Sequence, residues 1–328
     1  MNLHENKRLF TDAVLATAQH LEINPVFVEK DYWITRSLKL MSEADTDSRA
    51  IFKGGTSLAK AHLIGSRFSE DIDIAIADVG SLNGNQRKMF IKRLAKSMTK
   101  GLVEKLSPGV TSKGSNYYKA IFSYEGLTEL TDMSTAIPVK TGQIMVEINS
   151  FANPYPYDEC VIDNFVRIFL HESGNQEIIR QYDMDTFSLK VLDKKRTATE
   201  KIVSLIRFSL SHDYEIELPK KIRHFYDLYY LKENKECSRY FNSEEFICDL
   251  RSLLHHDREM FDNPKGWNVR KLSESPLFHS FSEMWEATLS VVYNEELSCL
   301  AYKSIPDSQL VLENVSSIIE KIKESGIT

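Results

Sequence analysis

The first half of the chain alternates between helical and strand-like spacing of its hydrophobic residues. Over residues 5–21, four of them recur at helical intervals: Phe10, Val14, Ala18 and Leu21. This spacing predicts an amphipathic helix. A second helix is predicted to begin at Asn24-Pro25, because a capping residue followed by proline is typical of a helix start.

Residues 51–76 predict a short strand, a glycine-rich turn, a short helix, a loop and a second strand. A lysine-rich helix is predicted over 86–106. Two strands follow, Tyr117–Tyr124 and Ile144–Phe151, separated by a loop rich in Thr, Asp and Ser. The proline-rich stretch at 152–158 interrupts the pattern and is the best candidate for a linker between domains.

Beyond this stretch the pattern is mostly helical. Thr197-Ala-Thr-Glu200 has the sequence of a capping box and predicts a helix start, and Pro219 predicts another. The fold class is therefore α+β. We expect one domain over residues 1–155 and a mainly helical domain over 156–328.

Length and charge narrow the class of protein. At 328 residues the chain exceeds the size that one hydrophobic core usually serves, which favours two domains. The net charge of -6 argues against a protein that coats nucleic acid by bulk electrostatics. Any contact with nucleic acid must come from a local basic patch, such as the 86–106 helix with Lys190, Lys194, Lys195 and Arg196, unless these side chains are only solvated.

The cysteines and the N-terminus indicate a reducing compartment. Four scattered cysteines without a CxxC pair fit neither a zinc site nor a disulfide framework. The first residues, MNLHENKRLF, lack the apolar core of a signal peptide, and no stretch reaches membrane-spanning length. We therefore expect a cytoplasmic protein that does not bind membranes.

The stretch Asp71-Ile-Asp73-Ile-Ala-Ile76 carries the first candidate chemistry. Side chains alternate across a strand, so the two aspartates share one face and the isoleucines share the other. Two carboxylates this close repel each other unless a cation, a proton or a basic side chain compensates. Because Mg²⁺ is held by a few carboxylates plus substrate phosphates, the pair is a candidate metal site. The alternative is the exposed face of an edge strand.

Gly54-Gly55-Thr56-Ser57 lies shortly before the aspartates. A glycine pair lets the backbone approach a ligand closely, and a helix that begins at Thr56-Ser57 points free N–H groups at a phosphate. The hydroxyls of Thr56 or Ser57 could add hydrogen bonds. The sequence lacks the Lys-Ser or Lys-Thr of a P-loop, which excludes that solution. A tight turn without a ligand is the alternative.

A third carboxylate stands in the strand predicted over Ile144–Phe151. Alternation puts Glu147 and Asn149 on one face and Val146 and Ile148 on the other. If this strand lies beside the aspartates, Glu147 can coordinate a second ion or accept a proton from an attacking hydroxyl. A glutamate that simply faces solvent is the alternative.

Four stretches, in this order, resemble the AbiEii/AbiGii toxin family, within the nucleotidyltransferase superfamily that has the DNA polymerase β fold. They are Val28-Glu-Lys-Asp-Tyr-Trp33, Phe52-Lys-Gly-Gly-Thr-Ser57, Arg67-Phe-Ser-Glu-Asp-Ile-Asp73, and Glu200-Lys201 followed by Arg223-His-Phe-Tyr-Asp227. The combination is far more specific than any one stretch.

The resemblance implies a nucleotidyltransferase domain with a mixed sheet flanked by helices, and a helical domain that completes the active-site cleft. It implies a triphosphate positioned by Gly54, Gly55, Thr56 and Ser57, with Lys201 on the phosphates. It also implies Mg²⁺, or Mn²⁺, held by Asp71, Asp73 and Glu147. Asp227 is the implied late aspartate of the catalytic set.

The implied reaction moves a nucleoside monophosphate from an NTP to an acceptor and releases pyrophosphate. The resemblance points to the 3′ end of tRNA as acceptor, to growth arrest in phage defence as outcome, and to a separately encoded antitoxin as counterpart. Two other functions stay open: a DxD glycosyltransferase that uses a sugar nucleotide, and a non-catalytic protein that binds a nucleotide or a partner. Similarly, Arg223 and Asp227, spaced i,i+4, could form only a surface salt bridge.

Overall fold

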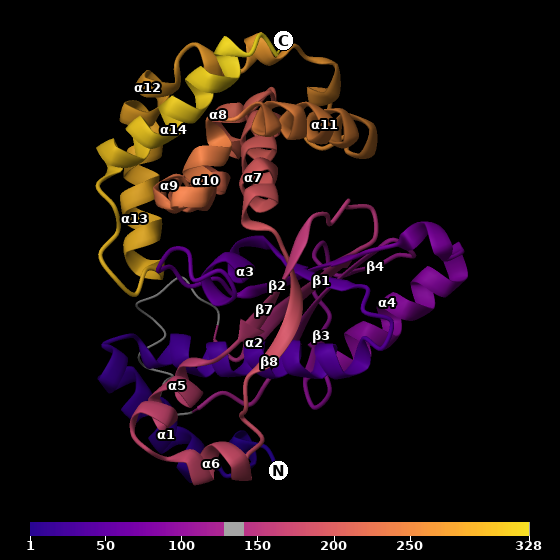
Figure 1. Ribbon diagram of the computed structural model, residues 1–328, viewed down its shortest axis with the longest axis vertical. Coiled ribbons are helices and arrows are strands. Elements are labelled where there is room, and N and C mark those ends of the chain that lie inside the picture. Colours follow the sequence, from indigo (N-terminus) through magenta and orange to yellow (C-terminus); the bar gives the residue numbers. More distant parts are fainter. Residues whose placement is uncertain (128–140, 328) are drawn as a thin grey trace. The chain divides into compact units, whose positions relative to one another are not determined.

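The computed structural model describes residues 1–127 and 141–327. The chain divides into two compact units. Their residues can be followed in Figure 1, which is coloured along the sequence. Unit 1 contains Met1–Leu63 and Phe68–Leu192, and unit 2 contains Ile64–Arg67 and Asp193–Thr328. The division therefore differs from the expected one between residues 155 and 156. A polar loop was expected between the strands Tyr117–Tyr124 and Ile144–Phe151, and most of it lies outside the described residues.

Unit 1 is built on a mixed sheet with the strand order β3-β5-β6-β2-β1-β8-β7, and β4 pairs with β5. The pairs β1/β8 and β2/β6 are parallel and the remaining pairs are antiparallel. The strands are β1 Ala50–Lys53, β2 Asp71–Ile76, β3 Val103–Lys105, β4 Ser112–Lys113, β5 Tyr117–Ser123, β6 Gln143–Asn149, β7 Tyr157–Ile162 and β8 Phe187–Leu192.

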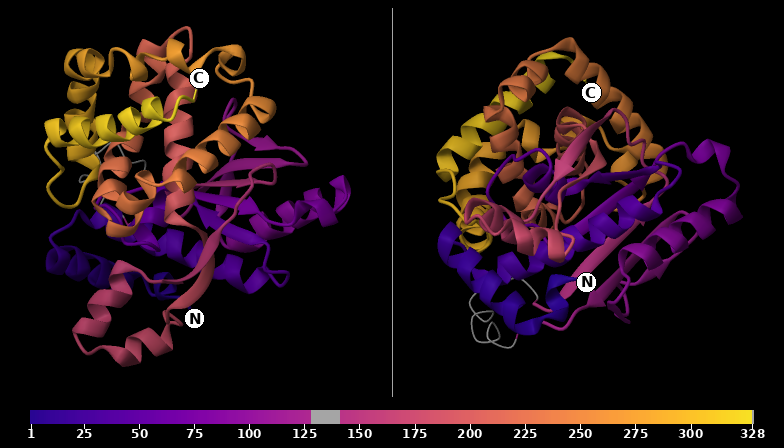
Figure 2. Two further views of the ribbon diagram at one scale, coloured as in Figure 1. Left: turned by 45° about the horizontal axis from the view of Figure 1, so that its top comes forward. Right: turned by 60° about the horizontal axis from the view of Figure 1, so that its bottom comes forward.

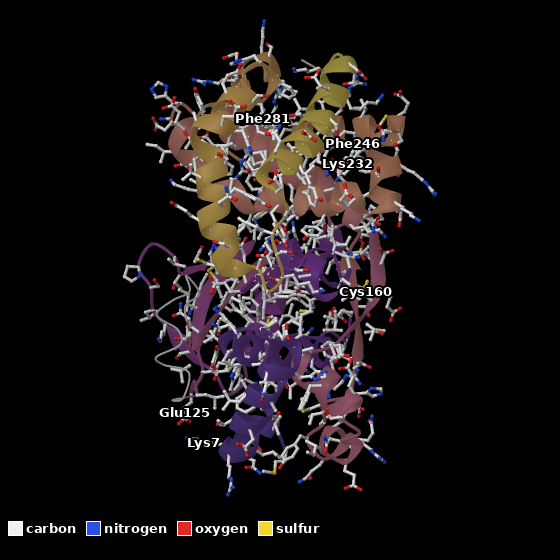
Figure 3. The ribbon with its side chains drawn as sticks, turned by 90° about the vertical axis from the view of Figure 1, so that its left-hand side faces the viewer. Lys7, Glu125, Cys160, Lys232, Phe246 and Phe281 are labelled. Carbon is white, nitrogen blue, oxygen red and sulfur yellow. The ribbon has the colours of Figure 1, made fainter. Side chains whose placement is uncertain are left out.

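Six α-helices accompany the sheet among the described residues of unit 1: α1 Lys7–Leu21, α2 Pro25–Ala44, α3 Gly54–Lys60, α4 Gly84–Met98, α5 Phe165–Glu172 and α6 Gln176–Gln181. The first two confirm the predicted helices. The side chain of Asn24 caps α2 by accepting from the backbone N–H of Val26 over 2.9 Å. At the N-terminal end of the unit, Lys7 of α1 forms an ion pair with Glu125, and the two lie side by side in Figure 3.

The core of unit 1 lies on one face of the sheet. α2 and α4 pack against each other and against β6 (Figure 2). Alternate residues of the central strands are buried toward this side, among them Ile72, Ile74, Val146 and Ile148, all with no exposed surface. The polar residues between them are left on the opposite face. The sheet therefore has a buried face and a face on which charged side chains gather.

Two predictions for unit 1 were wrong in part. The helix expected over 86–106 ends at Met98, because the chain turns at Gly101, whose φ is +85°, and enters β3. The stretch at 152–158 lies inside the unit rather than at a boundary, since it leads into β7, which begins at Tyr157 and pairs with β8. Both strands fall where a helical pattern was expected.

Unit 2 is helical. Its α-helices are α7 Lys194–Ser209, α8 Tyr214–Glu217, α9 Ile222–Glu233, α10 Lys235–Phe241, α11 Glu244–Met260, α12 Phe281–Met284, α13 Ser290–Leu300 and α14 Ser308–Glu324. In its core the rings of Phe225 and Phe281 stack with centroids 5.7 Å apart, and Trp285 meets both edge-on. α9 follows a single turn that begins at Pro219, near the predicted start.

The capping box predicted at Thr197 does not open α7. The helix begins three residues earlier, and the carboxylate of Asp193 caps it by accepting from the backbone N–H groups of Lys195 and Arg196 over 2.7 and 3.2 Å. Thr197 is buried inside the helix. All four cysteines are free thiols. No helix within the described part of the chain has the length and apolar character needed to cross a bilayer.

Candidate functional site

Strand pairing in unit 1 brings charged side chains into one row. In the parallel pairing of β2 with β6, Asp73 lies opposite Glu147. Each flanking strand adds a lysine, because Lys53 of β1 lies opposite Asp73 and Lys119 of β5 lies opposite Glu147. The row therefore consists of two carboxylates between two lysines. We call these four residues the charged row.

A second row lies one step along the same face. Asp71 is paired with Met145 of β6, and Met145 with Ile121 of β5. Because side chains alternate across a strand, Asp71 shares its face with Asp73, while Ile72 between them is completely buried on the other side. The predicted separation of the aspartates from the isoleucines is confirmed.

The neighbouring carboxylates disturb the ionisation of Asp73. Burial, Glu147 and Asp71 raise the pKa of Asp73 to about 7. Lys53 and Lys119 pull this pKa in the opposite direction but do not restore its usual range. Asp73 is therefore a carboxyl group with too little positive charge nearby, which is the situation in which a bound cation is stabilising.

Two side chains of β5 hold Glu147. The Nζ of Lys119 lies 3.1 Å from its Oε2. Burial and the Glu147 carboxylate, with which its hydroxyl forms a hydrogen bond, raise the pKa of Tyr117 above its usual range. Since a tyrosine that remains protonated donates its hydrogen, Glu147 is fixed in place as an acceptor.

Gly54 brings the start of α3 against Asp73. Its φ is +83°, and a Cβ atom at this position would lie 2.3 Å from the Oδ2 of Asp73. Glycine alone meets both conditions without strain. α3 begins at Gly54, two residues before the Thr56-Ser57 start that was expected.

The hydroxyls of Thr56 and Ser57 are engaged within the unit. The Oγ1 of Thr56 donates to the backbone oxygen of Asp71 over 2.5 Å and lies 2.9 Å from the Oγ of Ser69. The Oγ of Ser57 donates to the backbone oxygen of Gly54 over 2.9 Å. Both side chains are buried. They fix the turn against the first residue of β2, and the backbone of the glycine turn is the part next to the charged row.

The carboxylates do not form a metal cage by themselves. Within residues 1–127 and 141–327, no three His, Cys, Asp or Glu side chains are gathered in a way that would hold a metal ion. Asp71, Asp73 and Glu147 lie on two adjacent strands, so an ion bound to them needs further ligands from outside the protein. This donor set fits Mg²⁺, which commonly uses one or two carboxylates, phosphate oxygens and several waters.

Lys201 and Asp227 belong to a buried ion cluster of unit 2. The Nζ of Lys201 on α7 lies 2.7 Å from the Oδ2 of Asp227 on α9, and both side chains are 6% exposed. Arg67 completes the cluster, since its Nε and Nη2 donate to the two oxygens of Asp227 over 2.7 Å each. Burial acts to raise the pKa of Asp227, but Arg67 and Lys201 overcome it and hold this pKa well below its usual range.

Arg67 reaches this cluster because the segment Ile64–Arg67 belongs to unit 2. The backbone N–H of Ser66 donates to the hydroxyl of Tyr226 over 2.9 Å. The backbone oxygen of Ser66 accepts from the N–H of Tyr302 over 2.9 Å. The segment is therefore tied to α9 and to the loop after α13.

The salt bridge considered between Arg223 and Asp227 is wrong. The Nε of Arg223 lies 2.6 Å from the Oε1 of Glu296 on α13. Asp227 turns inward to Arg67 and Lys201 instead. The i,i+4 spacing allows a pair on one helix, but it does not reveal a better partner from another element.

The basic side chains around residue 190 are engaged in local contacts. Lys190 donates to the backbone oxygen of Ser48 over 2.9 Å. Lys194 forms an ion pair with Glu236 at 2.6 Å. These contacts favour a structural role for this stretch over a dedicated basic patch.

Four residues of these clusters were not predicted as site residues: Tyr117, Lys119, Lys53 and Arg67. Alternation along the predicted strand at 117–124 places the first two on one face, so this signal was available. The sequence gives no signal for the pairing of β5 with β6, because it joins strands that are separated in the sequence. For Arg67, no local pattern indicates that it joins the helical unit.

The charged row lies on a mixed sheet accompanied by helices, the architecture that the resemblance implies for a nucleotidyltransferase domain. The chain belongs to the AbiEii family: the family model, described as the nucleotidyl transferase AbiEii toxin of a type IV toxin–antitoxin system, matches residues 36–314. The protein is accordingly a nucleotidyltransferase of a toxin family. This finding disfavours the glycosyltransferase alternative.

A solved structure supports the fold. MenT4, a nucleotidyltransferase toxin from Mycobacterium tuberculosis, is similar to this chain with a TM-score of 0.52 and 15% sequence identity, over 94% of this chain and 98% of that chain. JHP933 from Helicobacter pylori has a TM-score of 0.40 and 14% identity, over 90% of this chain and 94% of that chain. No curated protein matches the chain.

Gly54→Ala is predicted to destabilise unit 1. A residue with a Cβ in this left-handed conformation costs about 1–2 kcal/mol, and the approach of 2.3 Å to Asp73 adds to this cost. Gly84→Ala is the matched control, because a Cβ there meets nothing within 4 Å. Urea unfolding should show a clear loss for the first variant and none for the second. Equal midpoints would contradict the close approach described here.

Asp73→Asn is predicted to stabilise the metal-free protein more at pH 8 than at pH 5. The pKa of Asp73 in the folded chain, about 7, lies above the ordinary aspartate value, so the folded state binds more protons between the two values. Stability therefore falls as the pH rises from roughly 4 to 7. Because asparagine carries no charge in either state, its advantage should grow with pH. Urea unfolding in EDTA measures this, and a pH-independent gain would refute it.

Arg67→Met is predicted to cost more stability than Lys201→Met. Arg67 gives Asp227 two hydrogen bonds, whereas the contact with Lys201 is single. Breaking a buried ion pair typically costs about 3–5 kcal/mol, and we expect the arginine variant to fall in this range. Chemical denaturation of both variants provides the comparison. A larger loss for Lys201→Met would show that lysine is the main partner of Asp227.

Proposed function

We propose that the protein transfers a nucleoside monophosphate from an NTP to the 3′ end of an RNA acceptor, with tRNA as the natural acceptor. The observation that carries this proposal is the charged row, together with Asp71 beside it. The raised pKa of Asp73 supports a bound cation there, because a cation would stabilise the carboxylate. The family assignment supplies the reaction class.

Mg²⁺, or Mn²⁺ in its place, is proposed to be held by Asp71 and Asp73, with the remaining ligands taken from phosphate oxygens and water. When bound, the ion would neutralise triphosphate charge and polarise the reacting phosphoryl group. The glycine turn is proposed to hold the phosphates through backbone N–H groups at the start of α3, to which side-chain-free glycines allow close access. Thr56 and Ser57 keep this turn in position.

Glu147 is proposed to accept the proton of the attacking hydroxyl. The oxygen of that hydroxyl forms a bond to the α-phosphorus, the bond from the α-phosphorus to the bridging oxygen breaks, and pyrophosphate leaves. Lys119 and Tyr117 fix the carboxylate for this role. This positioning is supported by the hydrogen bonds that both residues make to Glu147.

Lys201 is proposed to donate to the departing phosphates. In the structure it is an ion-pair partner of Asp227, so binding a phosphate means exchanging one anionic partner for another. Arg67 contacts both carboxylate oxygens of Asp227 and would keep that aspartate paired during the exchange. Asp227 is therefore proposed as the residue that positions Lys201.

The type IV toxin–antitoxin description of the family supports a separately encoded antitoxin as the counterpart. Growth arrest in phage defence is proposed as the cellular outcome. NTPs and tRNA are both cytoplasmic, so we propose that the protein acts in the cytoplasm.

Asp71→Ala and Asp73→Ala are predicted to abolish transfer. Wild type and variants are incubated with each of the four α-labelled NTPs, Mg²⁺ and total cellular RNA, and labelled RNA is separated by size. We expect a loss of more than about 100-fold, the usual effect of removing a group that stabilises charge in the transition state. Asp158→Ala is the matched control, since this exposed aspartate lies on β7 of the same sheet. EDTA should abolish wild-type labelling.

Two results would contradict the proposal. Retained labelling by Asp71→Ala and Asp73→Ala would remove the carboxylates from the reaction. Tight NTP binding by the wild type without pyrophosphate release, across all RNA acceptors, would support the non-catalytic alternative instead.

A further inference from the structure

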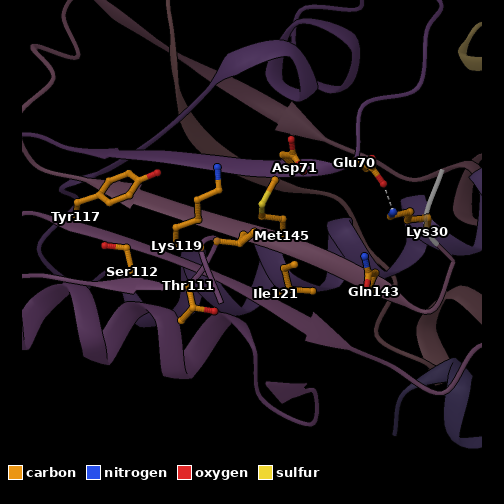
Figure 4. A pocket seen from close by; sticks show the side chains of 12 residues that line it. Lys30, Glu70, Asp71, Thr111, Ser112, Tyr117, Lys119, Ile121, Gln143 and Met145 are labelled. Atoms are coloured by element: carbon orange, nitrogen blue, oxygen red, sulfur yellow. Dashed lines mark hydrogen bonds and ion pairs between the residues drawn. The ribbon is translucent and has the colours of Figure 1, made fainter. Parts of the chain in front are cut away.

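A cavity of about 570 Å³ lies within unit 1 beside the carboxylates (Figure 4). Its lining comes from α2, from the residues that enter β2, from the 109–112 loop, and from β5 and β6. Tyr117 lies at one end and the ion pair of Lys30 with Glu70 at the other, with Met145 and Ile121 between them. The volume is that of a small-molecule site, for which about 300–1,000 Å³ is usual.

The chemistry of the lining suits an uncharged ring with polar edges. Met145 and Ile121 form an apolar floor on the open face of the sheet. Hydrogen-bonding side chains surround them: Thr111, Ser112, Tyr117 and Gln143. The charged members are two lysines and two carboxylates, so the lining has no excess of positive charge to attract a triphosphate. A nucleobase has the matching combination of a flat apolar face and donor and acceptor edges.

The position of the cavity relative to the charged row indicates whether it takes the nucleobase of the NTP or that of the acceptor. The glycine turn follows β1, on one side of β2, whereas the cavity lies over β6 and β5, on the other side. In a phosphoryl displacement the attacking and leaving oxygens lie roughly in line on opposite sides of the phosphorus. With the triphosphate on the glycine side, the attacking hydroxyl has to come from the cavity side.

We propose that this cavity binds the terminal nucleoside of the RNA acceptor, an inference that rests on the proposed function. Its base lies on Met145 and Ile121, with one edge toward Gln143. Its sugar hydroxyl is directed past Asp71, which borders the cavity, toward Glu147, the proposed proton acceptor, which lies opposite Lys119 of the lining. Sequence-specific recognition of RNA usually uses unpaired bases that can be enclosed in this way. The cavity is therefore a determinant of which RNA end is modified.

Ile121→Trp places a bulky ring on the floor of the cavity, where the base is proposed to lie, and provides the test. We expect the affinity for a short single-stranded RNA, measured by fluorescence anisotropy, to fall about tenfold or more, the effect of losing one stacked base. The KM for RNA should rise by a similar factor. The Kd for a non-hydrolysable NTP with Mg²⁺ should stay within about twofold, since the NTP lies elsewhere. Val161→Trp is the matched control, because Val161 is an exposed residue on β7 of the same sheet.

Gln143→Leu is the second variant, in case tryptophan disturbs the fold. It keeps the size of the side chain but removes its hydrogen-bonding edge, so the variant should change the preference among RNAs that differ only in their last base. Thermal unfolding of all variants shows whether the fold is kept.

The outcomes separate this inference from the proposed function. If wild type labels no RNA, the proposed function fails; if it also binds no RNA, this inference fails with it. If wild type labels RNA and both cavity variants do so with unchanged KM and base preference, only the assignment of the cavity is overturned. A higher Kd for the NTP with unchanged RNA binding would assign the cavity to the base of the NTP and would also overturn it.

Discussion

Repulsion between carboxylates on adjacent strands is the constraint on which the site in unit 1 depends. The register of β2 with β6 sets Asp73 opposite Glu147, and the isoleucines buried beneath them prevent a shift of register, since a slip by one residue would turn the apolar side chains outward. The sheet therefore cannot relieve the repulsion by moving. The lysines on the flanking strands reduce it, and the glycine turn leaves space for the Asp73 carboxylate.

Unit 2 also contains a buried aspartate, but its charge is compensated by basic side chains. Asp227 is buried, yet its pKa is lowered because Arg67 and Lys201 both face it. Asp73 has its pKa raised because two carboxylates outweigh the nearby lysines. One aspartate has more than enough positive charge and the other has too little. This contrast distinguishes a cluster that is complete within the protein from a site at which a bound cation would be stabilising.

Sequence reasoning worked where the signal is local. The alternation in β2 and β6, the start of α2 at Asn24-Pro25 and the family motifs all depend on residues close together in the chain. It did not find β7 and β8, because these short strands are held by their mutual pairing and by β1 rather than by a strong pattern of their own. The cap of α7 was missed because Asp193 directly follows β8, a strand whose end was not predicted. The cavity could not be predicted, since its lining comes from five separate segments.

The segment Ile64–Arg67 limits how the helical unit could be exchanged between genes. The chain on both sides of these residues belongs to unit 1, yet they are hydrogen-bonded within unit 2. A gene fragment that starts at residue 193 would encode every helix described in unit 2 but not the arginine that pairs with Asp227. Residues from 193 onward are therefore not a self-sufficient helical unit. Recombination that exchanges it between related toxins would have to carry a tetrapeptide from the middle of the other unit as well.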